Sequence, residues 1–140
     1  MSYQFAENQA SINQPSSFRL APNVAALISY IWIPVTSILV LVTEKENRTV
    51  RFHAFQSLFL GLAVFVSSIV LSVVMGILGG IAAMFSATLG MLVMFGSLIL
   101  WLVFTVAIVA AWVMCLVKAY RSEMYQLPFV GKFAERMASK

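Results

Sequence analysis

The sequence predicts an all-α integral membrane protein with three transmembrane helices and a short C-terminal interfacial amphipathic helix. Residues 54–117 form 64 consecutive positions without a formally charged side chain. Hydrophobic residues make up 61% of the 140-residue chain and charged residues only 10%, which leaves too little polar surface to cover a soluble globule of this size. Together these observations predict that most of the chain lies in lipid.

The first two parts of the chain differ sharply in composition. Residues 1–22 are rich in Gln, Asn and Ser and have no apolar period, which predicts a mobile polar tail. Residues 23–120 form the predicted transmembrane helical module, and its first span is the uncharged run from Val24 to Val42. Pro34 is expected to bend this helix near its middle, because proline has no backbone N–H and its ring crowds the preceding turn.

The long uncharged run contains two further predicted spans. The hydrocarbon core is about 30 Å thick and a helix rises about 1.5 Å per residue, so one crossing needs roughly 20 residues. Three crossings within residues 54–117 would leave only about 4 residues for two turns. Three spans in the whole chain are therefore favoured, with four as the alternative.

The basic residues predict how these spans are oriented. With three spans, the first loop and the C-terminal segment together carry eight of the nine Lys and Arg residues, whereas four spans divide them six to three. Cytoplasmic segments are rich in Lys and Arg, so loop 43–53 and the C-terminus are predicted to be cytoplasmic and the N-terminus outside. The chain is expected to be a multi-pass protein of the cell inner (cytoplasmic) membrane, in contact with membrane lipid.

A stripe of small residues is predicted on one side of the second span. Its members recur every four residues and are Ser68, Ser72, Gly76 and Gly80. Small residues at this spacing let another helix backbone approach closely, which permits packing where the hydrophobic effect cannot drive association. The approaching helix belongs either to the same subunit or to a second copy in a homo-oligomer.

Residues 121–140 are predicted to form a cytoplasmic C-terminal interfacial segment. A short helix opened by Pro128 would align three apolar side chains at four-residue spacing, those of Phe129, Phe133 and Met137. The opposite side would carry the charged side chains of Lys132, Glu135 and Arg136. Such an amphipathic helix lies at a membrane surface, as an anchor or as a docking site for a partner.

Polar side chains concentrate in the loop after the first span and at the start of the second. At helical spacing His53 lies beside Gln56 and Ser57, and Arg48 and Arg51 precede them. Polar groups at the end of a membrane helix bind a headgroup, an ion or a partner, or they solvate the helix end. The sequence leaves both interpretations open.

The residue types give little support to catalysis. The chain has one His, one Cys and no acidic residue inside a predicted span, so a single copy cannot assemble a zinc cluster or a buried carboxylate relay. Glycine-rich phosphate-binding motifs are also absent from the sequence. We expect no enzyme, no catalytic residue, no metal, no cofactor and no nucleic-acid partner. An enzyme acting on lipid would need His53 as a base and a second chain or a bound metal.

Three segments carry a resemblance to known proteins. They are Asn23 to Leu27, Glu46 to Ser57, and Lys118 to Tyr120 together with Tyr125 to Pro128. Over roughly residues 23–136 the chain resembles a small bacterial membrane-protein family of unknown function, related to the channel component of the chloroplast inner-envelope translocon (Tic). The most specific piece is Arg51-Phe-His-Ala-Phe-Gln-Ser57.

The resemblance implies a compact helical membrane module and, for the plastid branch, a role in protein translocation. It implies no catalytic residue. Plastid members are expected to have four spans, whereas charge and length here favour three. The candidate partner- or headgroup-binding residues are Arg48, Arg51, His53, Gln56, Ser57, Tyr125 and Pro128.

The leading predicted function is a non-enzymatic integral membrane subunit or scaffold within a larger membrane complex. Its cytoplasmic face, built from loop 44–57 and the C-terminal helix, would bind a protein partner. The alternative is a homo-oligomeric transport or protein-translocation component that assembles through the small-residue stripe. Oligomerisation is needed in that case because one copy has too few helices to enclose a wide pore.

Overall fold

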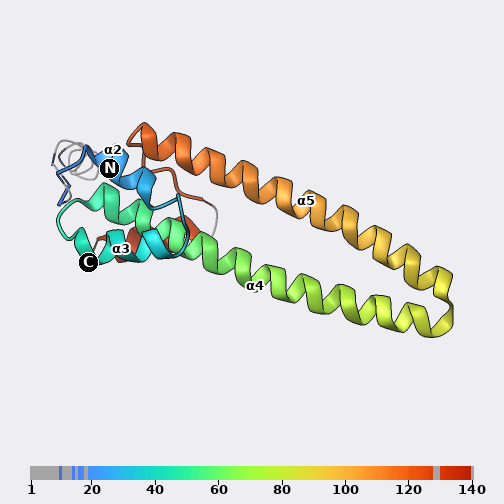
Figure 1. The fold of residues 1–140 in the computed structure, drawn as a ribbon. Helices are drawn as coiled ribbons and strands as arrows, with labels where there is room; N and C mark the ends of the chain where they lie inside the picture. The colour runs from blue at the N-terminus through green and yellow to red at the C-terminus, as the bar shows by residue number, and fades with distance from the viewer. Residues whose placement is uncertain (1–9, 11–13, 15, 18, 128–129, 140) are drawn as a thin grey trace. The chain divides into compact units, whose positions relative to one another are not determined.

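The computed structural model describes residues 10, 14, 16–17, 19–127 and 130–139. Within these residues all regular secondary structure is helical (Figure 1). The helices are α2 (Pro22–Ile28), α3 (Val35–Thr43), α4 (Arg48–Phe85), α5 (Ala87–Tyr120) and α6 (Val130–Ala138). The predicted all-α class is confirmed for this part of the chain.

Two of these helices are long and apolar enough to cross a membrane, namely α4 and α5. They have 38 and 34 residues, which at a rise of about 1.5 Å per residue makes about 57 Å and about 51 Å. Both lengths exceed the hydrocarbon core of about 30 Å. The two candidate spans predicted within the long uncharged run are therefore present.

The chain divides into two compact units. The first consists of residues 1–62 and 112–140, and the second consists of residues 63–111. Helices α4 and α5 each contribute residues to both units. Every charged residue of the sequence falls within the ranges of the first unit, and the second unit has none.

The second unit is a helical hairpin whose two antiparallel arms are joined at Ser86 (Figure 1). The Ser86 N–H donates to Ala82 O at 3.1 Å at the end of α4, and Ser86 Oγ accepts from the Leu89 N–H at 3.1 Å at the start of α5. Close to this turn a methyl group at Gly90 would lie only 2.9 Å from the Ala83 Cβ. A glycine at position 90 therefore lets the arms approach.

The first predicted span consists of two short helices instead of one helix. Helix α2 ends at Ile28 and α3 begins at Val35, with turns between them. With 7 and 9 residues, neither helix reaches the roughly 20 residues that one crossing needs. The structure does not confirm a third transmembrane helix. Pro34, which was expected to bend a continuous helix, lies directly before α3.

Side chains replace the backbone hydrogen bonds that this break removes. Ser37 Oγ donates to the Ser29 carbonyl at 3.0 Å, and Trp112 Nε1 donates to the Tyr30 carbonyl at 3.0 Å. Donors from hydroxyl groups and from a neighbouring helix allow a helix to be interrupted in apolar surroundings. The interruption is thus stabilised by contacts from two other parts of the chain.

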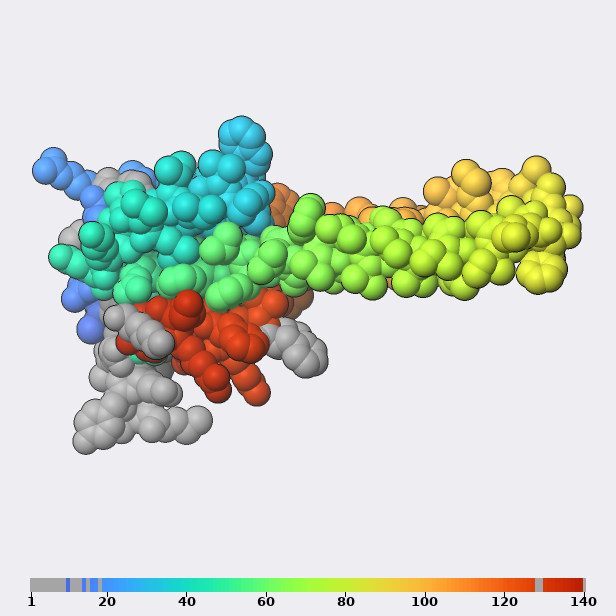
Figure 2. Space-filling view, turned by 90° about the horizontal axis from the view of Figure 1, so that it is seen from below, coloured from blue at the N-terminus to red at the C-terminus, as the bar shows by residue number. Residues whose placement is uncertain are grey.

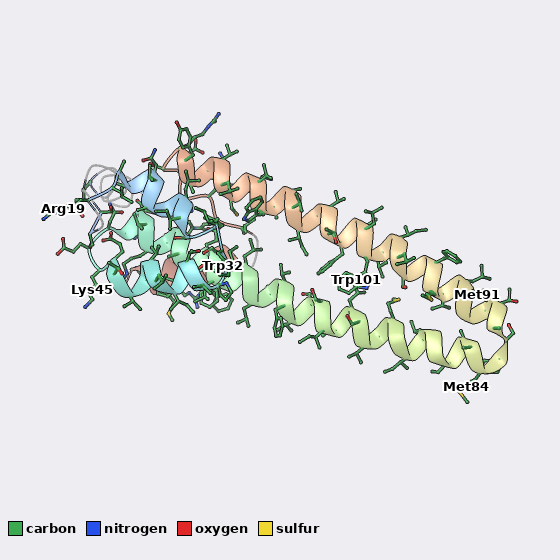
Figure 3. The ribbon with its side chains drawn as sticks, in the orientation of Figure 1. Arg19, Trp32, Lys45, Met84, Met91 and Trp101 are labelled. Carbon is green, nitrogen blue, oxygen red and sulfur yellow. The ribbon has the colours of Figure 1, made fainter. Side chains whose placement is uncertain are left out.

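Helices α2 and α3 form an antiparallel pair, which we call the N-terminal hairpin (residues 22–43). Ala25 shares a buried cluster with Val40, and Ser29, which follows α2, is bonded by Ser37 of α3. A residue later in the first segment thus contacts a residue earlier in α3, which is the pattern of an antiparallel pair. Figure 3 shows Arg19 and Lys45 at one end of the pair and Trp32 at the other end. The chain therefore leaves the hairpin at the end where it entered.

The N-terminal hairpin packs against both long helices within the first unit. A cluster shared with α4 consists of Ala25, Val40, Val50 and Ala54. A cluster shared with α5 consists of Ala26, Tyr30, Cys115 and Ala119. The turn of the hairpin also approaches α4, because a methyl group at Gly61 would collide with the side chain of Ile33.

Helix α6 packs on the start of α4 through its smallest side chains. Ala134 and Ala138 are buried against Phe52, and the red α6 lies beside the green start of α4 in Figure 2. The apolar side predicted from the sequence is not the buried one, since Phe133 is 60% exposed and Met137 is 43% exposed. The bulky aromatic rings of α4 favour small partners on α6. Phe129, predicted for the same side, lies outside the described residues.

Candidate functional site

The segment between α3 and α4 is held by one buried carboxylate, that of Glu44. This side chain is fully buried, and its two oxygens accept four hydrogen bonds. The donors are the Ser17 N–H (2.7 Å), the Ser17 hydroxyl (3.0 Å), the Asn47 N–H (3.0 Å) and the Glu46 N–H (3.2 Å). Hydrogen bonds to an ionised acceptor are stronger than neutral ones. Glu44 therefore ties an N-terminal residue to the start of α4.

Asn47 makes a second connection to the N-terminal residues. Its Oδ1 accepts from the Val50 N–H at 3.1 Å, which is the bond of a helix N-cap, and its amide donates to the Gln14 carbonyl at 2.8 Å. Ser17 thus bonds directly to Glu44, and Gln14 bonds directly to Asn47. The orientation predicted from the sequence put these two segments on opposite sides of the membrane, and the structure does not confirm that orientation.

His53 and Gln56, two of the predicted binding residues, are each only 1% exposed. His53 Nδ1 and the Tyr30 hydroxyl form a hydrogen bond of 3.3 Å, which joins α4 to the N-terminal hairpin. Gln56 Nε2 donates to Cys115 Sγ at 3.5 Å, which joins α4 to α5. Both side chains therefore contribute contacts inside the first unit.

Ser57, a third predicted binding residue, is also fully buried. Its hydroxyl lies 2.6 Å from the hydroxyl of Ser37, which itself donates to the Ser29 carbonyl. Ser29 Oγ and Gln56 Oε1 have no hydrogen-bond partner among the described residues. We call this group the polar cluster and define it as Ser29, Tyr30, Ser37, His53, Gln56 and Ser57.

The two predicted arginines are more accessible than the polar cluster. The Arg48 side chain is 15% exposed, and one of its guanidinium nitrogens lies 4.0 Å from a carboxylate oxygen of Glu135 on α6. Arg51, one turn further along α4, is half-buried. Arg48 thus helps to hold α6 on α4, where exposed ion pairs contribute at most about 1 kcal/mol.

Tyr125 is exposed on the segment between α5 and α6, with 37% of its surface accessible. The Lys118 ammonium lies 5.6 Å from the centre of its ring, a distance suited to a cation–π contact. Lys118 also donates to Glu123, and this bond together with the charges of Lys118 and Arg121 lowers the pKa of Glu123. Pro128, the last predicted binding residue, lies outside the described residues.

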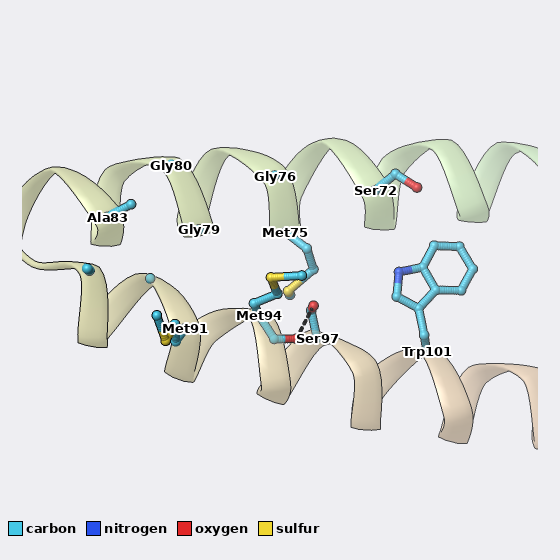
Figure 4. Close-up of a pocket in the computed structure, with 12 residues that line it drawn as sticks. Ser72, Met75, Gly76, Gly79, Gly80, Ala83, Met91, Met94, Ser97 and Trp101 are labelled. Atoms are coloured by element: carbon cyan, nitrogen blue, oxygen red, sulfur yellow. Dashed lines mark hydrogen bonds between the residues drawn. The ribbon is translucent and has the colours of Figure 1, made fainter.

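The predicted small-residue stripe borders a groove in the second unit. The groove has a volume of about 650 Å³ and is lined from both arms of the hairpin (Figure 4). Ser72, Gly76 and Gly80 line it from α4, and Met94, Ser97 and Trp101 line it from α5. A methyl group at Gly76 or Gly80 would meet nothing within 4 Å, whereas one at Gly79 would contact Val93 at 3.9 Å.

The hydroxyl groups of the stripe are used within their own helix. Ser68 Oγ donates to the Val64 carbonyl at 2.7 Å, and Ser72 Oγ donates to the Ser68 carbonyl at 2.8 Å. The stripe therefore adds no side-chain hydrogen bond between the two arms in the described residues. Its glycines leave open space instead of a close helix contact.

Sequence reasoning assigned no specific contact to Glu44, Tyr30 or Trp112, although each makes a contact that holds the first unit together. Their partners are distant in sequence; for example, Trp112 and Tyr30 are separated by 82 residues. A local signal existed for Glu44, because acidic and Asn side chains just before a helix accept bonds from its unpaired N–H groups. Among the described residues, no group of three or more His, Cys, Asp or Glu side chains is placed to hold a metal ion.

Comparison with known proteins gives consistent matches. Residues 19–134 match the model of the magnetosome magnetite crystal formation protein family. A UPF0132 membrane protein of Archaeoglobus fulgidus is 36% identical over 114 residues, which cover 81% of this chain and 92% of that protein. A UPF0132 membrane protein of Methanocaldococcus jannaschii is 31% identical over 121 residues, which cover 86% of this chain and 92% of that protein.

These comparisons confirm a small membrane-protein family and show no link to the chloroplast translocon. No solved structure matches the chain.

Proposed function

Because the chain belongs to the magnetosome magnetite crystal formation protein family, and its archaeal relatives are named as membrane proteins, we propose that it is a non-enzymatic integral membrane subunit or scaffold. It acts by binding a protein partner through the charged surface of its first unit. That surface is defined by the exposed side chains of Lys45, Arg121, Lys132 and Arg136.

The separation of charge between the two units is the observation that carries this proposal. The second unit is free of charged residues, so its outward side chains suit lipid. The first unit holds all nine basic residues and all five acidic ones. A partner in water therefore has charged groups to recognise on the first unit alone.

The sign of the charge indicates both the side of the membrane and the kind of partner. Lys and Arg accumulate on the cytoplasmic side, so the charged surface faces the cytoplasm of a cell with this protein in its inner membrane. The chain has a formal net charge of +4. An acidic surface on the partner complements it, which favours encounter and fixes orientation.

The polar cluster supports this surface from inside. His53, Gln56 and Ser57 connect α4 to α5 and to the N-terminal hairpin, and Glu44 fixes the loop that carries Lys45. In this proposal the polar cluster holds the helices of the first unit in place, and the exposed basic side chains contact the partner.

The family description names magnetite crystal formation, whereas the archaeal relatives are named as membrane proteins without a stated mineral. A scaffold that assembles proteins at a membrane suits either setting, because recognition depends on the charged surface and not on a mineral. The proposal therefore applies to this chain whether or not its membrane encloses magnetite.

The proposal is tested by extraction in mild detergent at native expression, followed by size analysis and identification of the co-purifying proteins. We expect an unlike protein to co-purify with the wild type and with the charge-conserving variant Lys132→Arg/Arg136→Lys. The charge-reversed variant Lys132→Glu/Arg136→Glu should lose that protein at equal abundance and equal melting temperature. Equal recovery with both variants would contradict the assignment of the charged surface.

The groove in the second unit favours one alternative, a homo-oligomeric transport component. A methyl group at Gly76 or Gly80 would meet open space at the edge of the groove, and small-residue faces of this kind seat helices in membranes. A second copy in this position would add helices around a path across the membrane.

The alternative predicts a specific effect of filling the groove. Gly76→Leu should break an oligomer of identical chains, whereas Gly96→Leu, at another glycine with open space around it, should leave the oligomer intact. Size analysis in mild detergent distinguishes them. A wild-type chain that elutes with unlike partners and without copies of itself would exclude this alternative.

A further inference from the structure

The N-terminal hairpin brings the chain back to its starting side. Hydrogen bonds join Ser17 to Glu44 and Gln14 to Asn47, so the residues before and after the hairpin are in direct contact. The opposite end is the turn at residues 29–34, which carries Trp32 (Figure 3). A helix that crossed a membrane here would separate its two ends by the full thickness of the bilayer.

The length of each arm is suited to one leaflet. Helices of 7 and 9 residues are about 10 Å and about 14 Å long at about 1.5 Å per residue. The hydrocarbon core is about 30 Å thick. Each arm thus extends through less than half of that distance.

The side of the hairpin that does not pack on α4 and α5 is apolar. In the turn, Ile31 is 70% exposed and Trp32 is 69% exposed. Along α3 the exposed apolar side chains are Val35, Ile38, Leu39 and Val42. In Figure 2 the light-blue turn between α2 and α3 projects from the first unit. These side chains need an apolar medium around them.

The charges around the hairpin point to a lipid leaflet as that medium. Residues 20–43 include no charged side chain, and exposed Arg19 and Lys45 lie at the two ends of the segment. This is the arrangement expected when an apolar segment enters lipid and the basic groups beside it stay at anionic headgroups.

Two backbone carbonyl groups of the turn have hydrogen-bond partners within the protein, as a location in lipid requires. Irregular backbone at membrane depth must find hydrogen-bond partners within the protein. Ser37 donates to the Ser29 carbonyl and Trp112 donates to the Tyr30 carbonyl, so these two groups of the break are paired. Only residues 31–34 separate these two groups from the start of α3.

We infer that residues 22–43 form a re-entrant hairpin that enters one leaflet of the bilayer and returns to the same side. The N-terminus, the loop between α3 and α4 and the C-terminus then share the cytoplasmic side. All nine basic residues lie there, which satisfies the positive-inside rule more fully than the eight of nine of the three-span arrangement. The inference does not depend on the proposed protein partner.

Depth in the bilayer is the first test, in vesicles of phosphatidylcholine and phosphatidylglycerol. An environment-sensitive fluorophore is attached to the variant Ile31→Cys. The native Cys115 is retained, because it is buried and shielded from the label. We expect stronger quenching by lipids with a nitroxide near the headgroup than by lipids with a nitroxide near the chain end, and none by aqueous iodide. Leu98→Cys in the second unit is the deep control, and Lys45→Cys is the aqueous control.

Two results would overturn the inference at this step. Strongest quenching of the Ile31 label by the chain-end nitroxide would show that the segment reaches the bilayer centre, as a full span does. Quenching by iodide to the level of the Lys45 label would show that the turn is accessible to water and does not lie in the leaflet.

Sidedness is the second test and needs no change within the hairpin. The variants Ser2→Cys, Lys45→Cys, Ser139→Cys and Thr88→Cys, each with buried Cys115 retained, are treated with an impermeant thiol reagent in intact cells. The first three should be protected and Thr88, beside the turn of the second unit, should react. After permeabilisation all four should react, which shows that each introduced thiol is accessible, and an unchanged melting temperature in detergent shows that each variant is folded. Labelling of Ser2 in intact cells would overturn the inference and restore a full first span.

Discussion

Glu44 shows how a single residue can join three segments of this chain. Its carboxylate accepts from Ser17 of the N-terminal segment and from the backbone at the start of α4, and it is itself the residue that ends α3. Full burial removes competing water, so each of these bonds contributes more than it would at the surface. We expect Glu44 to control whether residues 14–17 stay in place.

Replacing this carboxylate should therefore release the N-terminal segment. Glu44→Ala removes the acceptor for four donors, and hydrogen bonds to charged groups contribute about 1.5–3 kcal/mol each to stability. Trypsin cleavage after the exposed Arg19 should become faster, and the melting temperature in detergent should fall. Glu46→Ala is the matched control, because Glu46 is exposed and its backbone N–H is unchanged. Similar cleavage rates for the two variants would contradict this role of Glu44.

His53 shows that the role of a polar residue depends on whether its side chain is buried. A polar side chain at a helix start suits either a binding site or an internal contact, and the residue type does not distinguish them. In the structure the ring is 1% exposed and packs edge-on against Phe52, with ring centres 5.3 Å apart. The packing of this motif on neighbouring elements therefore assigns it to the interior.

At the scale of elements, the turn of the N-terminal hairpin depends on one glycine of α4. Gly61 lies under Ile33, and an added methyl group would collide with that side chain. Glycine is unfavourable in the middle of a helix by about 0.5–1 kcal/mol relative to alanine. Glycine at this position thus lowers the intrinsic stability of α4 in exchange for a closer contact with the hairpin.

Alanine at Gly61 should lower stability, against the intrinsic preference of the helix. Gly61→Ala must displace Ile33 and with it the turn, so the melting temperature in detergent is expected to fall. Gly96→Ala is the matched control on α5, where nothing lies within 4 Å and the helix preference should raise the melting temperature or leave it unchanged. A rise for both variants would show that the turn does not rest on Gly61.

At the scale of the whole molecule, the division of charge follows the division into units. Residues 63–85 and 87–111 are two uncharged helical arms of about 34 Å and about 38 Å at about 1.5 Å per residue. Each is close to the thickness of the hydrocarbon core, about 30 Å with the interfacial ends beyond it. The second unit alone therefore meets the length and composition requirements of a transmembrane hairpin.

A charge in the middle of one arm should oppose insertion. Val74 lies near the centre of the α4 arm and is 44% exposed. Val74→Arg is expected to cost about 2.5–3.5 kcal/mol for insertion, since Arg is that unfavourable at the centre of a membrane helix. The fraction of protein that resists carbonate extraction from membranes should fall. Val74→Leu controls for side-chain volume, and equal retention of both variants would show that this arm does not lie in lipid.

The helical class, the membrane environment and the two long helices are all predictable from the sequence. Each depends on a local property: a charge-free run of 64 residues suits lipid, and in lipid a chain satisfies its backbone hydrogen bonds by forming helices. The basic residues at both ends of the long run were equally visible.

The fold of residues 22–43 and the burial of the polar residues after them, by contrast, follow from tertiary contacts. An uncharged run of this length is compatible with one spanning helix or with two short ones. The choice depends on contacts between distant residues, such as Trp112 with Tyr30 and Ser37 with Ser57. For the same reason the predicted binding residues His53, Gln56 and Ser57 proved to be interior, because burial is a property of how elements pack and is absent from the order of residues along the chain.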